Sequence, residues 1–356
     1  MSAPTSGSAA ADPERSSRAI HQGMPEPESG ARIVRGGHGE FRVTDLDKAR
    51  HFYVDLLGFI ETERTSDALY LRGYEDRDHH NLVLRRDASP GAGPLAFRVH
   101  DDDDLDKLER YFAREGLPLR RIEEDEEPGQ GRAIRTQSPA GLPLEFFASM
   151  ERVERMLQQF DQYRGAQVMR FDHFNCQVPD VNAEYRFFAD GLGFGCSEYT
   201  ATDDEPERLW AAWLHRKQNV HDIALMNGIG PRLHHCGFWL ADTLSVLRAC
   251  DILAGAGMES AIERGPGRHG ISNAFFLYLR DPDGNRVEFY ANDYLIADPD
   301  WEPIRWSLDD PRRATFWGHA APASWFDEAS HCESIMTGEL LPVSEPQLVD
   351  RPQHVT

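Results

Sequence analysis

The pattern of apolar and polar residues changes near residue 31 and then becomes regular. Residues 1–30 are rich in Ser, Ala, Pro, Gly and Glu and have no apolar period, which predicts a flexible tail. The stretch GEFRVTD then alternates like a strand, and DLDKARHFYVDLLGF has the apolar spacing of one helical face from Leu46 to Leu56. Gly58 is a suitable C-cap for that helix. Strands are expected at residues 68–72 and 81–85, which gives a unit of strand, helix and several strands.

The same plan recurs along the chain. A strand is expected at 95–99, a helix at 104–115, and strands that end in PAGLPLEFF. After a connector at 150–163 that we expect to be helical, RFDHFNCQVPDVNAEYRFFADGLGF repeats the rhythm of VRGGHGEFRVTDLDKARHFYVDLLGF, and DPDGNRVEFY repeats SPAGLPLEFF. Internal repetition of this kind indicates duplication.

We therefore predict an α+β fold of four similar βαβββ modules, with each pair of modules forming an open, barrel-like sheet around a cavity. The expected divisions are a tail at 1–30, an N-terminal domain at 31–165, a C-terminal catalytic domain at 166–295, and a lid or arm with a tail at 296–356.

Composition narrows the classes of partner. The 356 residues suffice for about two domains, and the formal charge of −22 argues against nucleic acid or an anionic membrane as partner. The five cysteines lack CxxC spacing, which favours a reduced compartment. No apolar run is long enough to span a bilayer, and no signal-peptide pattern is present, so we expect a cytoplasmic protein.

A strand and hairpin pattern near residue 280 carries candidate chemistry. In RGPGRHGISNAFFLYLRDPDGNRVEFY, the sequence from Asp281 to Gly284 favours a tight turn between two strands. If Val287 and Phe289 face one layer, Glu288 faces the other. A carboxylate among apolar strand residues needs a cation or hydrogen bonds.

The order of residues in this hairpin closely resembles the signature of the class I extradiol ring-cleaving dioxygenases, in the vicinal oxygen chelate (glyoxalase-like) superfamily. The matching residues are Gly267, His269, Tyr278, Asp281, Pro282, Gly284 and Glu288. Other stretches, LWAAWLHRKQNVHDIAL, GPRLHH and ERGPGRHG among them, are similar to homoprotocatechuate (3,4-dihydroxyphenylacetate) 2,3-dioxygenases. The resemblance extends from about residue 33 to 320.

The resemblance implies a mononuclear metal site made by His173, His235 and Glu288. Two histidines and one carboxylate are the recurrent non-haem Fe(II) arrangement, and Mn(II) suits the same ligands. No HExxH or Cys-rich zinc motif is present, so these ligands must converge from separate strands. Of the tandem His234-His235, the resemblance implies His235, because the family's ligand is the second of the pair. Neighbours on a strand point to opposite faces, so only one of the two can face the cavity.

The duplication offers a comparison within the chain. Aligning the two halves places His38 opposite His173, Glu145 opposite Glu288, and about Pro94 opposite His235. Proline cannot ligate a metal through its side chain. We therefore interpret the N-terminal half as a vestigial site with a structural task.

The resemblance also implies roles around the metal. His221 would be the acid/base beside the O2 site, and Tyr278 would hydrogen-bond the substrate or the oxygenated intermediate. The other expected contacts with substrate are Asn175, Trp213, Arg264, His269 and Arg313. Arginine suits the carboxylate of an aryl acetate, although the spacing at Arg312-Arg313 leaves open which of the two makes that contact.

The expected function is extradiol cleavage of 3,4-dihydroxyphenylacetate by O2, which gives 5-carboxymethyl-2-hydroxymuconate semialdehyde in aromatic-compound catabolism. Fe(II) is the expected cofactor, with Mn(II) as the alternative, and a homotetramer without nucleic acid or membrane partners is expected. Three alternatives stay open: another catechol, such as protocatechuate or dihydroxyphenylpropionate; a glyoxalase-like metal-dependent lyase or isomerase; and a small-molecule binding protein without catalysis.

Overall fold

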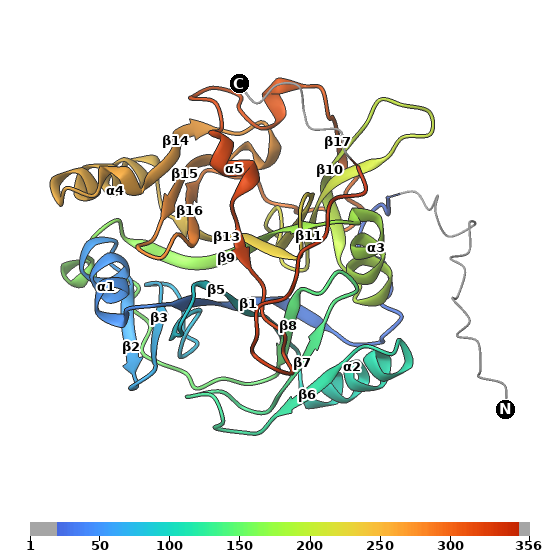
Figure 1. Cartoon of the computed structure of the whole chain (residues 1–356), viewed down its shortest axis with the longest axis horizontal. Coiled ribbons are helices and arrows are strands. Elements are labelled where there is room, and N and C mark those ends of the chain that lie inside the picture. Colours follow the sequence, from blue (N-terminus) through green and yellow to red (C-terminus); the bar gives the residue numbers. More distant parts are fainter. Residues whose placement is uncertain (1–19, 349–356) are drawn as a thin grey trace, which may run out of the picture.

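The computed structural model describes residues 20–348, which form two β-sheets with helices against them (Figure 1). In Figure 1 the N-terminal half, blue to green, lies below the C-terminal half, yellow to orange, and the red C-terminal segment runs across both. Each half contains two modules of strand, helix and three strands. The predicted α+β fold of four βαβββ modules is therefore confirmed.

The N-terminal half forms an eight-stranded sheet in the order β2-β3-β4-β1-β5-β8-β7-β6. Its first module consists of β1 (Ile33–Val43), α1 (Leu46–Arg50), β2 (Ile60–Arg64), β3 (Ala68–Arg72) and β4 (Leu82–Arg86). Its second module consists of β5 (Gly91–Val99), α2 (Asp102–Arg114), β6 (Leu119–Ile122), β7 (Ala133–Gln137) and β8 (Pro143–Phe147). The modules join where β1 pairs with β5 in antiparallel register.

The C-terminal half repeats this order as β14-β15-β16-β13-β9-β12-β11-β10, to which β17 is added at one edge. Its first module consists of β9 (Val168–Val178), α3 (Val181–Arg186), β10 (Gly195–Ala201), β11 (Leu209–His215) and β12 (Ile223–Asn227). Its second module consists of β13 (Arg232–Leu240), α4 (Thr243–Gly255), β14 (Ile262–Arg268), β15 (Phe275–Arg280) and β16 (Arg286–Ala291). Here β9 and β13 join the modules in antiparallel register.

All four module helices begin in the same way. An aspartate in extended conformation precedes each helix, and its carboxylate accepts a hydrogen bond from a backbone N–H of the first turn. Such a cap contributes about 1 kcal/mol to a helix. The cap residues are Asp45, Asp101, Asp180 and Asp242.

The first helix of each half continues as a wider π-helical turn, at His51–Leu56 and at Phe187–Gly191. In the first of these turns Phe52 and Tyr53 are buried, as the apolar spacing predicts. Gly58 follows at φ +86°, a left-handed conformation that glycine adopts without strain.

The two halves share one apolar core along β1 and β9. Phe97 on β5 packs edge-on against Phe174 on β9, with ring centroids 5.5 Å apart. Gly39 has no room for a side chain, because a Cβ there would lie 2.7 Å from Sγ of Cys236. The contact explains why β1 carries glycines where it crosses the other half.

The connector between the halves differs from the prediction. We expected a helix over 150–163, but only the 3₁₀ turn Phe160–Gln162 is helical there. Arg152 instead forms a bridge with Asp78, and the N–H of Val153 donates to the carbonyl of Arg77 at 2.9 Å. These long-range bonds take up backbone groups that a helix would have paired within itself.

The ends of the described chain lie against the folded halves. Residues 1–19 of the predicted N-terminal tail and 349–356 of the C-terminal tail lie outside the described residues. Within residues 20–30, the N–H of Gly23 donates to the carbonyl of Trp301 at 3.0 Å, and that of Glu28 donates to the carbonyl of Asp190 at 2.9 Å.

We call residues 304–348 the C-terminal arm. It contains β17 (Ile304–Ser307), a 3₁₀ turn (Pro311–Arg313), α5 (Ala323–Asp327) and β18 (Ser330–His331). β17 pairs with β10 and β18 pairs with β13, both in the C-terminal half. Glu333 then forms ion pairs with Arg42 and Arg85 of the N-terminal half. The arm is thus attached to both sheets.

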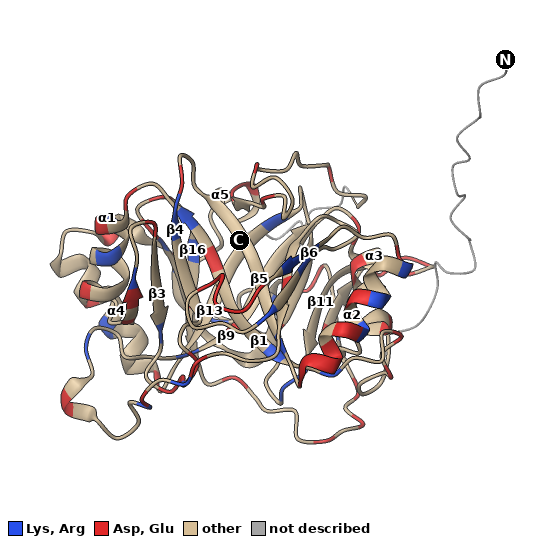
Figure 2. Ribbon diagram, turned by 90° about the horizontal axis from the view of Figure 1, so that it is seen from below, with Lys and Arg blue, Asp and Glu red and all other residues tan. Residues whose placement is uncertain are grey.

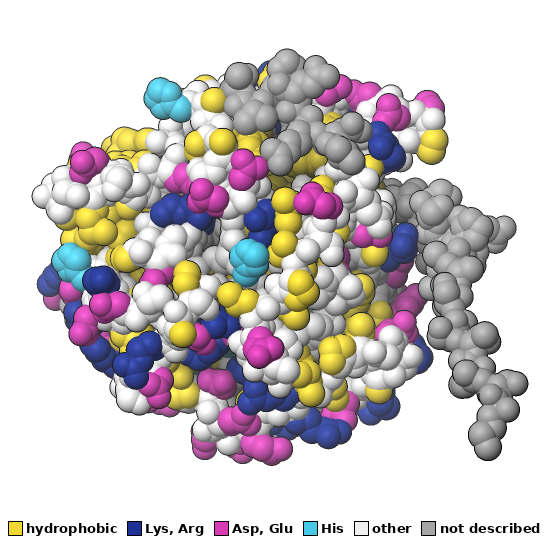
Figure 3. All heavy atoms as spheres, viewed as in Figure 1, with side chains coloured by type: hydrophobic (Ala, Val, Ile, Leu, Met, Phe, Trp, Pro, Cys, Tyr) yellow, Lys and Arg dark blue, Asp and Glu magenta, His cyan; other side chains and the backbone are white. Residues whose placement is uncertain are grey.

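Charged side chains of both signs are interspersed on the surface. Figure 2 shows acidic and basic residues side by side along α2 and α3, and the face in Figure 3 mixes both signs with apolar residues. The five cysteines are free thiols. Within residues 20–348, every helix is too short or too polar to cross a membrane.

Candidate metal centre

The three predicted ligands lie on adjacent strands of the C-terminal sheet. His173 is on β9, His235 on β13 and Glu288 on β16, and β13 is the central strand of these three. Gly237 pairs with His173 on one side and with Glu288 on the other. The duplicated sheet therefore brings together residues that are far apart in the sequence.

The ligand atoms of the three side chains form a compact triangle. Nε2 of His173 is 3.0 Å from Oε2 of Glu288 and 3.3 Å from Nε2 of His235. The third side of the triangle, from Nε2 of His235 to Oε2 of Glu288, is 3.1 Å. Two atoms bound at right angles to a cation at about 2.1 Å lie about 3 Å apart. The triangle therefore fits a divalent cation held on one face, and these buried residues could hold a metal ion.

Gly237 makes the room that this triangle needs. A Cβ at this position would lie 2.2 Å from Cε1 and 2.3 Å from Nε2 of His173. A methyl group would therefore displace the imidazole from its position beside Glu288.

Burial and pairing set the protonation of the ligands. Although burial opposes it, hydrogen bonds to Asp172 and Glu288 raise the pKa of His173 to about 9. Burial lowers the pKa of His235 to about 4. Burial would raise the pKa of Glu288, but the two histidines hold it well below its usual range. Without a cation, His173 is therefore protonated at pH 7 beside the Glu288 carboxylate. A divalent metal would displace the proton from Nε2, and one carboxylate with two imidazoles is a donor set suited to such a metal.

Asp172 contacts the first of the three candidate ligands. Its Oδ2 lies 3.1 Å from Nδ1 of His173 and accepts a hydrogen bond from Nδ2 of Asn219 at 2.8 Å. A hydrogen on Nδ1 leaves Nε2 of His173 free to bind metal. Sequence reasoning missed Asp172, although an acidic residue beside a ligand histidine is a signal for this role.

His221 lies against His173, in the segment just before β12. Its ring centroid is 3.9 Å from that of His173, it is buried, and its Nδ1 has no hydrogen-bond partner among the described residues. Burial lowers the pKa of His221 well below its usual range, so the ring is neutral at pH 7. A neutral imidazole with a free nitrogen at a cavity wall can take a proton from a bound ligand.

Tyr278 and His269 form the opposite wall. The Tyr278 hydroxyl is 2.8 Å from Nε2 of His269, and Nδ1 of His269 is 2.5 Å from the carbonyl oxygen of Ala314. A carbonyl only accepts, so Nδ1 carries the hydrogen and Nε2 accepts from Tyr278. Burial lowers the pKa of His269 to about 3 and raises that of Tyr278 well above its usual range, so both are neutral.

Two buried arginines reach the same cavity. Nη2 of Arg264 donates to the Ala314 carbonyl at 3.1 Å and to Oγ1 of Thr315 at 2.7 Å, and Nε of Arg313 donates to the Leu308 carbonyl at 3.2 Å. Among residues 20–348, neither forms an ion pair with a carboxylate, and burial lowers the pKa of Arg313 to about 10.

The neighbouring Arg312 does not line the cavity. Its side chain is 69% exposed and is paired with Asp310. Of the tandem arginines, the structure therefore places Arg313, and not Arg312, at the cavity.

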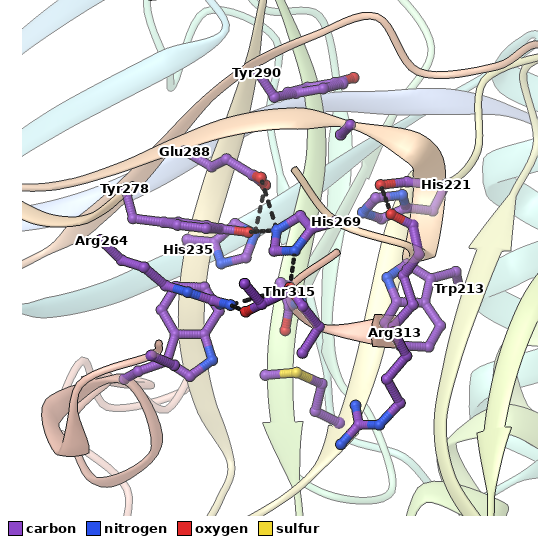
Figure 4. A pocket seen from close by; sticks show the side chains of 18 of the residues that line it. Trp213, His221, His235, Arg264, His269, Tyr278, Glu288, Tyr290, Arg313 and Thr315 are labelled. Carbon is purple, nitrogen blue, oxygen red and sulfur yellow. Dashed lines mark hydrogen bonds and ion pairs between the residues drawn. The ribbon is translucent and has the colours of Figure 1, made fainter. Parts of the chain in front are cut away.

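All ten predicted site residues line one cavity, which has about 1060 Å³ of empty space including its open mouth. Figure 4 shows His221 and Trp213 on one side of it, Tyr278 and Arg264 on the other, and Glu288 in the upper part of the view. Asn175 also lines it, and its Oδ1 has no hydrogen-bond partner among the described residues.

The arm supplies wall residues that the sequence did not indicate. Ala314, Thr315 and Trp325 also line the cavity. No local motif marks them, since they come from the arm and meet the sheet only in the folded chain.

The N-terminal half carries a counterpart of this centre. Ala96 on β5 pairs with His38 and with Glu145, as Gly237 pairs with His173 and Glu288. Ala96 thus corresponds to Gly237. Pro94 precedes Ala96 by two residues, as His235 precedes Gly237, so Pro94 corresponds to His235. The register therefore places Pro94 as the alignment of the repeats predicts.

An arginine occupies the counterpart centre. Arg135 pairs with Glu145 as Tyr278 pairs with Glu288. Nε of Arg135 is 2.5 Å from Oε2 of Glu145, and Nε2 of His38 is 3.4 Å from Oε1. Here a guanidinium supplies the positive charge beside the carboxylate.

His221 also has a counterpart in the N-terminal half. β4 pairs with β1 through Leu82 and Gly39, as β12 pairs with β9 through Ile223 and Phe174. His80 therefore holds the position of His221, and its ring centroid lies 4.6 Å from that of His38.

Both halves of the chain match one family of known proteins. The profile of the Glyoxalase/Bleomycin resistance protein/Dioxygenase superfamily matches residues 35–146 and 170–289, one range in each half. A manganese-dependent 2,3-dihydroxybiphenyl 1,2-dioxygenase from Geobacillus genomosp. 3 is 32% identical over 85% of this chain and 99% of its own length. This chain is an extradiol dioxygenase of that superfamily.

Other relatives of this extradiol dioxygenase support the same membership. A metapyrocatechase from Pseudomonas sp. (strain CF600) is 32% identical over 80% of this chain and 94% of its own length. The anaerobic complex of homoprotocatechuate 2,3-dioxygenase from Brevibacterium fuscum with 3,4-dihydroxyphenylacetate has a TM-score of 0.86 and 39% identity. It covers 90% of this chain and 99% of the other. Extradiol dioxygenases use Fe(II), and the Geobacillus relative is manganese-dependent, so the predicted choice of Fe(II) or Mn(II) is confirmed at that level.

Proposed function

We propose that this dioxygenase cleaves a catechol that carries an acidic side chain, with 3,4-dihydroxyphenylacetate as the substrate. The observation that carries the proposal is the cavity itself. It combines the His173, His235 and Glu288 triangle with two buried guanidinium groups, on Arg264 and Arg313, that have no carboxylate partner among residues 20–348. A buried charge is costly unless it is paired, so an anionic group of the substrate would complete the site.

The metal and the protein have separate tasks. A divalent ion held by the three ligands would lower the pKa of a catechol hydroxyl and bring the ring and O2 together. O2 then supplies both oxygen atoms as the ring carbon–carbon bond beside the two hydroxyl groups breaks, and no external reductant is needed. The protein orients the ring, moves protons and keeps bulk water out.

His221 is the proposed acid/base. It is neutral, buried and in contact with the ring of His173, so its free Nδ1 can accept a catechol proton close to the metal. The protonated ring can return that proton to the product. Lys217 and Asp222 hold the segment before β12 through an ion pair of 2.9 Å.

The walls orient the substrate. The Tyr278 hydroxyl lies at the cavity, backed by His269, and can hydrogen-bond an oxygen atom of the bound ring. Asn175, whose Oδ1 is unpaired among the described residues, faces the same cavity from β9, and Trp213 on β11 supplies an apolar surface.

Arg313 is the proposed carboxylate contact, and Arg264 lies on the other side of the cavity (Figure 4). Arg313 is 5% exposed and lies over the Trp210 ring at 5.0 Å, and within the described part of the chain it makes one hydrogen bond, to a backbone carbonyl. Four of its five N–H groups are thus available, and a planar guanidinium can bind a carboxylate through two of them. The related Brevibacterium enzyme was solved with 3,4-dihydroxyphenylacetate, which supports this choice of substrate.

Steady-state kinetics with a pair of substrates test the proposal. 3,4-Dihydroxyphenylacetate and 4-methylcatechol share the ring and differ in the carboxylate. A charged hydrogen bond contributes about 1.5–3 kcal/mol, so Arg313→Met is expected to raise KM for the acid about 10- to 100-fold. The KM for 4-methylcatechol should change by less than about threefold, a difference well below the energy of one such bond.

The adjacent Arg312 provides the matched control, because it is exposed and paired with Asp310. Arg312→Met should leave both KM values unchanged. Equal effects of Arg313→Met on the two substrates, or a wild-type preference for the neutral catechol, would contradict the acidic substrate. Ring cleavage of another catechol would still leave the dioxygenase assignment in place.

Assembly and location stay predictions. We propose a homotetramer in the cytoplasm, with no nucleic acid or membrane as partner. The formal charge of −22 supports the last point, since nucleic acid and anionic lipid both attract basic surfaces. Light scattering on the purified protein would test the tetramer.

A further inference from the structure

An irregularity in β13 lies beside the metal ligand His235. Leu233 pairs with Cys176 and His235 pairs with Asn175, the next residue along β9 in the antiparallel direction, which leaves His234 without a partner. A bulge of this kind changes the direction of the side chain that it carries. His234 is fully buried, and its Nδ1 lies 2.7 Å from Nδ1 of His235.

The contacts of His234 define where its hydrogen lies. Nε2 of His234 is 2.8 Å from the backbone carbonyl oxygen of Trp325. A carbonyl only accepts, so Nε2 carries the hydrogen, and the Nδ1 of a neutral His234 is an acceptor. The short contact between the two Nδ1 atoms then needs a hydrogen on His235, which leaves Nε2 of His235 as the free lone pair.

We propose that His234 is a positioning residue, which holds His235 in the tautomer and orientation that present Nε2 to the metal, and that the C-terminal arm fixes His234 in turn. This inference rests on the proposed ligand set. Mutation of a residue that accepts a hydrogen bond from a ligand histidine typically lowers metal affinity about 10- to 100-fold. The hydrogen-bonded series runs from the Trp325 carbonyl through His234 to His235.

The N-terminal half provides a comparison within the chain. Gly93 stands at the position of His234 and Pro94 at that of His235, by the register of β5 with β1. A Cβ on Gly93 would lie 2.3 Å from Oε1 of Glu40, so a side chain there would have to displace that carboxylate. The half that lacks the ligand also lacks the residue that would orient it.

The C-terminal arm contacts the histidine pair through Trp325. Trp325 lies on α5, beyond both ranges that match the superfamily profile. Its ring packs edge-on against His234 at 4.3 Å and against Tyr278 at 4.2 Å. The arm therefore covers the cavity and also supplies the carbonyl that orders the histidine pair.

Two substitutions separate hydrogen bonding from packing. His234→Phe keeps a ring against Trp325 but removes the acceptor, whereas His234→Asn keeps an acceptor close to the position of Nδ1 and removes the ring. Mn(II) binding to the metal-free full-length protein would be measured from the EPR signal of the free ion. We expect His234→Phe to weaken binding about 10- to 100-fold and His234→Asn to weaken it less than about threefold. The reverse order would show that His234 only packs, and would overturn the proposal.

Glu288→Gln in the same titration distinguishes two outcomes: that His234 has no positioning role, and that the proposed ligand set is wrong. If both His234 variants bind Mn(II) like the wild type and Glu288→Gln does not, His234 has no positioning role and the ligand set stands. If Glu288→Gln also binds like the wild type, the ligand set itself is wrong, and the proposal falls with it.

A measurement on the wild-type protein does not depend on the folding of a variant. Long-range ¹H–¹⁵N correlation of the histidines in the Zn(II)-loaded chain, with Zn(II) as a diamagnetic probe, reports which ring nitrogen carries hydrogen and which binds metal. We expect His235 to bind through Nε2 with hydrogen on Nδ1, and His234 to carry hydrogen on Nε2. Metal on Nδ1 of His235, or hydrogen on Nδ1 of His234, would overturn the proposal.

Discussion

Arg135 donates a hydrogen bond to Glu145 across 2.5 Å, in the half of the molecule that lacks a complete set of metal ligands. Burial would raise the pKa of Glu145, but the guanidinium and His38 hold it well below its usual range. The same register in the other half sets Tyr278 beside Glu288. One scaffold thus surrounds a carboxylate with a guanidinium in one half and with two imidazoles, which can bind a cation, in the other.

The first prediction concerns metal content. Because Arg135 already neutralises Glu145, the chain should bind one metal ion, and Glu145→Gln should leave that content unchanged. Glu288→Gln should lose the metal. Elemental analysis of the purified variants would show the difference, and a second metal ion per chain that Glu145→Gln removes would contradict this view of the N-terminal half.

Gly237 provides a test of the geometry of the centre. Gly237→Ala should push the His173 ring away from Glu288, since the new Cβ would overlap Cε1, and metal affinity should fall at least about tenfold. Gly255→Ala near the end of α4 is the control, because a Cβ there meets no atom within 4 Å. Equal affinities of the two variants in the Mn(II) titration would contradict the proposed position of His173.

The acid/base role of His221 predicts a defect in turnover without a defect in binding. His221→Phe should lower kcat about 10²- to 10⁴-fold, the range for general acid–base catalysis, or divert the product, while metal content and substrate binding stay unchanged. His80→Phe removes the counterpart ring in the N-terminal half and should leave kcat unchanged. Turnover of His221→Phe at the wild-type rate would remove His221 from the mechanism.

Glu184 predicts a pH dependence of stability at the joint between the halves. It is fully buried on α3, accepts hydrogen bonds from Oγ of Ser138 and the N–H of Ala140, and burial raises its pKa to about 7 from 4.5. The folded state binds this proton more tightly than the unfolded state. The stabilisation is therefore complete below pH 4.5 and is lost as the pH rises through about 7.

Glu184→Gln isolates this effect, because glutamine does not titrate. From pH 5 to pH 8 the wild type should lose up to about 3 kcal/mol of unfolding free energy relative to the variant. Denaturant unfolding of the metal-free proteins at the two pH values would measure the difference. A difference that is independent of pH would mean that Glu184 stays in one protonation state in both the folded and the unfolded chain.

Much of the fold could be predicted because its modules repeat local patterns. Each of the four helices follows an aspartate that caps it, and aromatic pairs such as Phe52 and Tyr53 occupy the buried face. Alternation along β16 also placed Glu288 opposite Val287. These features depend on neighbours in the sequence, and so the sequence displays them.

The bulge at His234 could not be predicted from the same rules. Strict alternation predicts that His234 points away from His235, whereas the offset in pairing with β9 turns it toward His235. That offset depends on a strand some sixty residues away. Only the tandem histidines in the sequence mark the place.

Other features depended on contacts between distant segments. The connector at 150–163 is mostly not helical, because its backbone bonds to Arg77 and Asp78. Trp325 reaches the cavity from the arm, for which no repeat exists. The sequence did contain a signal for Arg135. This residue precedes Glu145 by ten residues (145 − 135), as Tyr278 precedes Glu288 (288 − 278), so an alignment of the repeats would have placed Arg135 opposite Tyr278.

The most direct test of the proposed reaction is oxygen consumption with isotope labelling. Fe(II)-loaded protein would be given 3,4-dihydroxyphenylacetate under ¹⁸O2, with O2 uptake, the appearance of a yellow product and its mass recorded together. We expect one O2 consumed for each molecule of substrate and both labelled oxygen atoms in the ring-opened product. With metal shown to be bound, the absence of O2 uptake across a panel of catechols, or a product without the label, would contradict extradiol cleavage by this site.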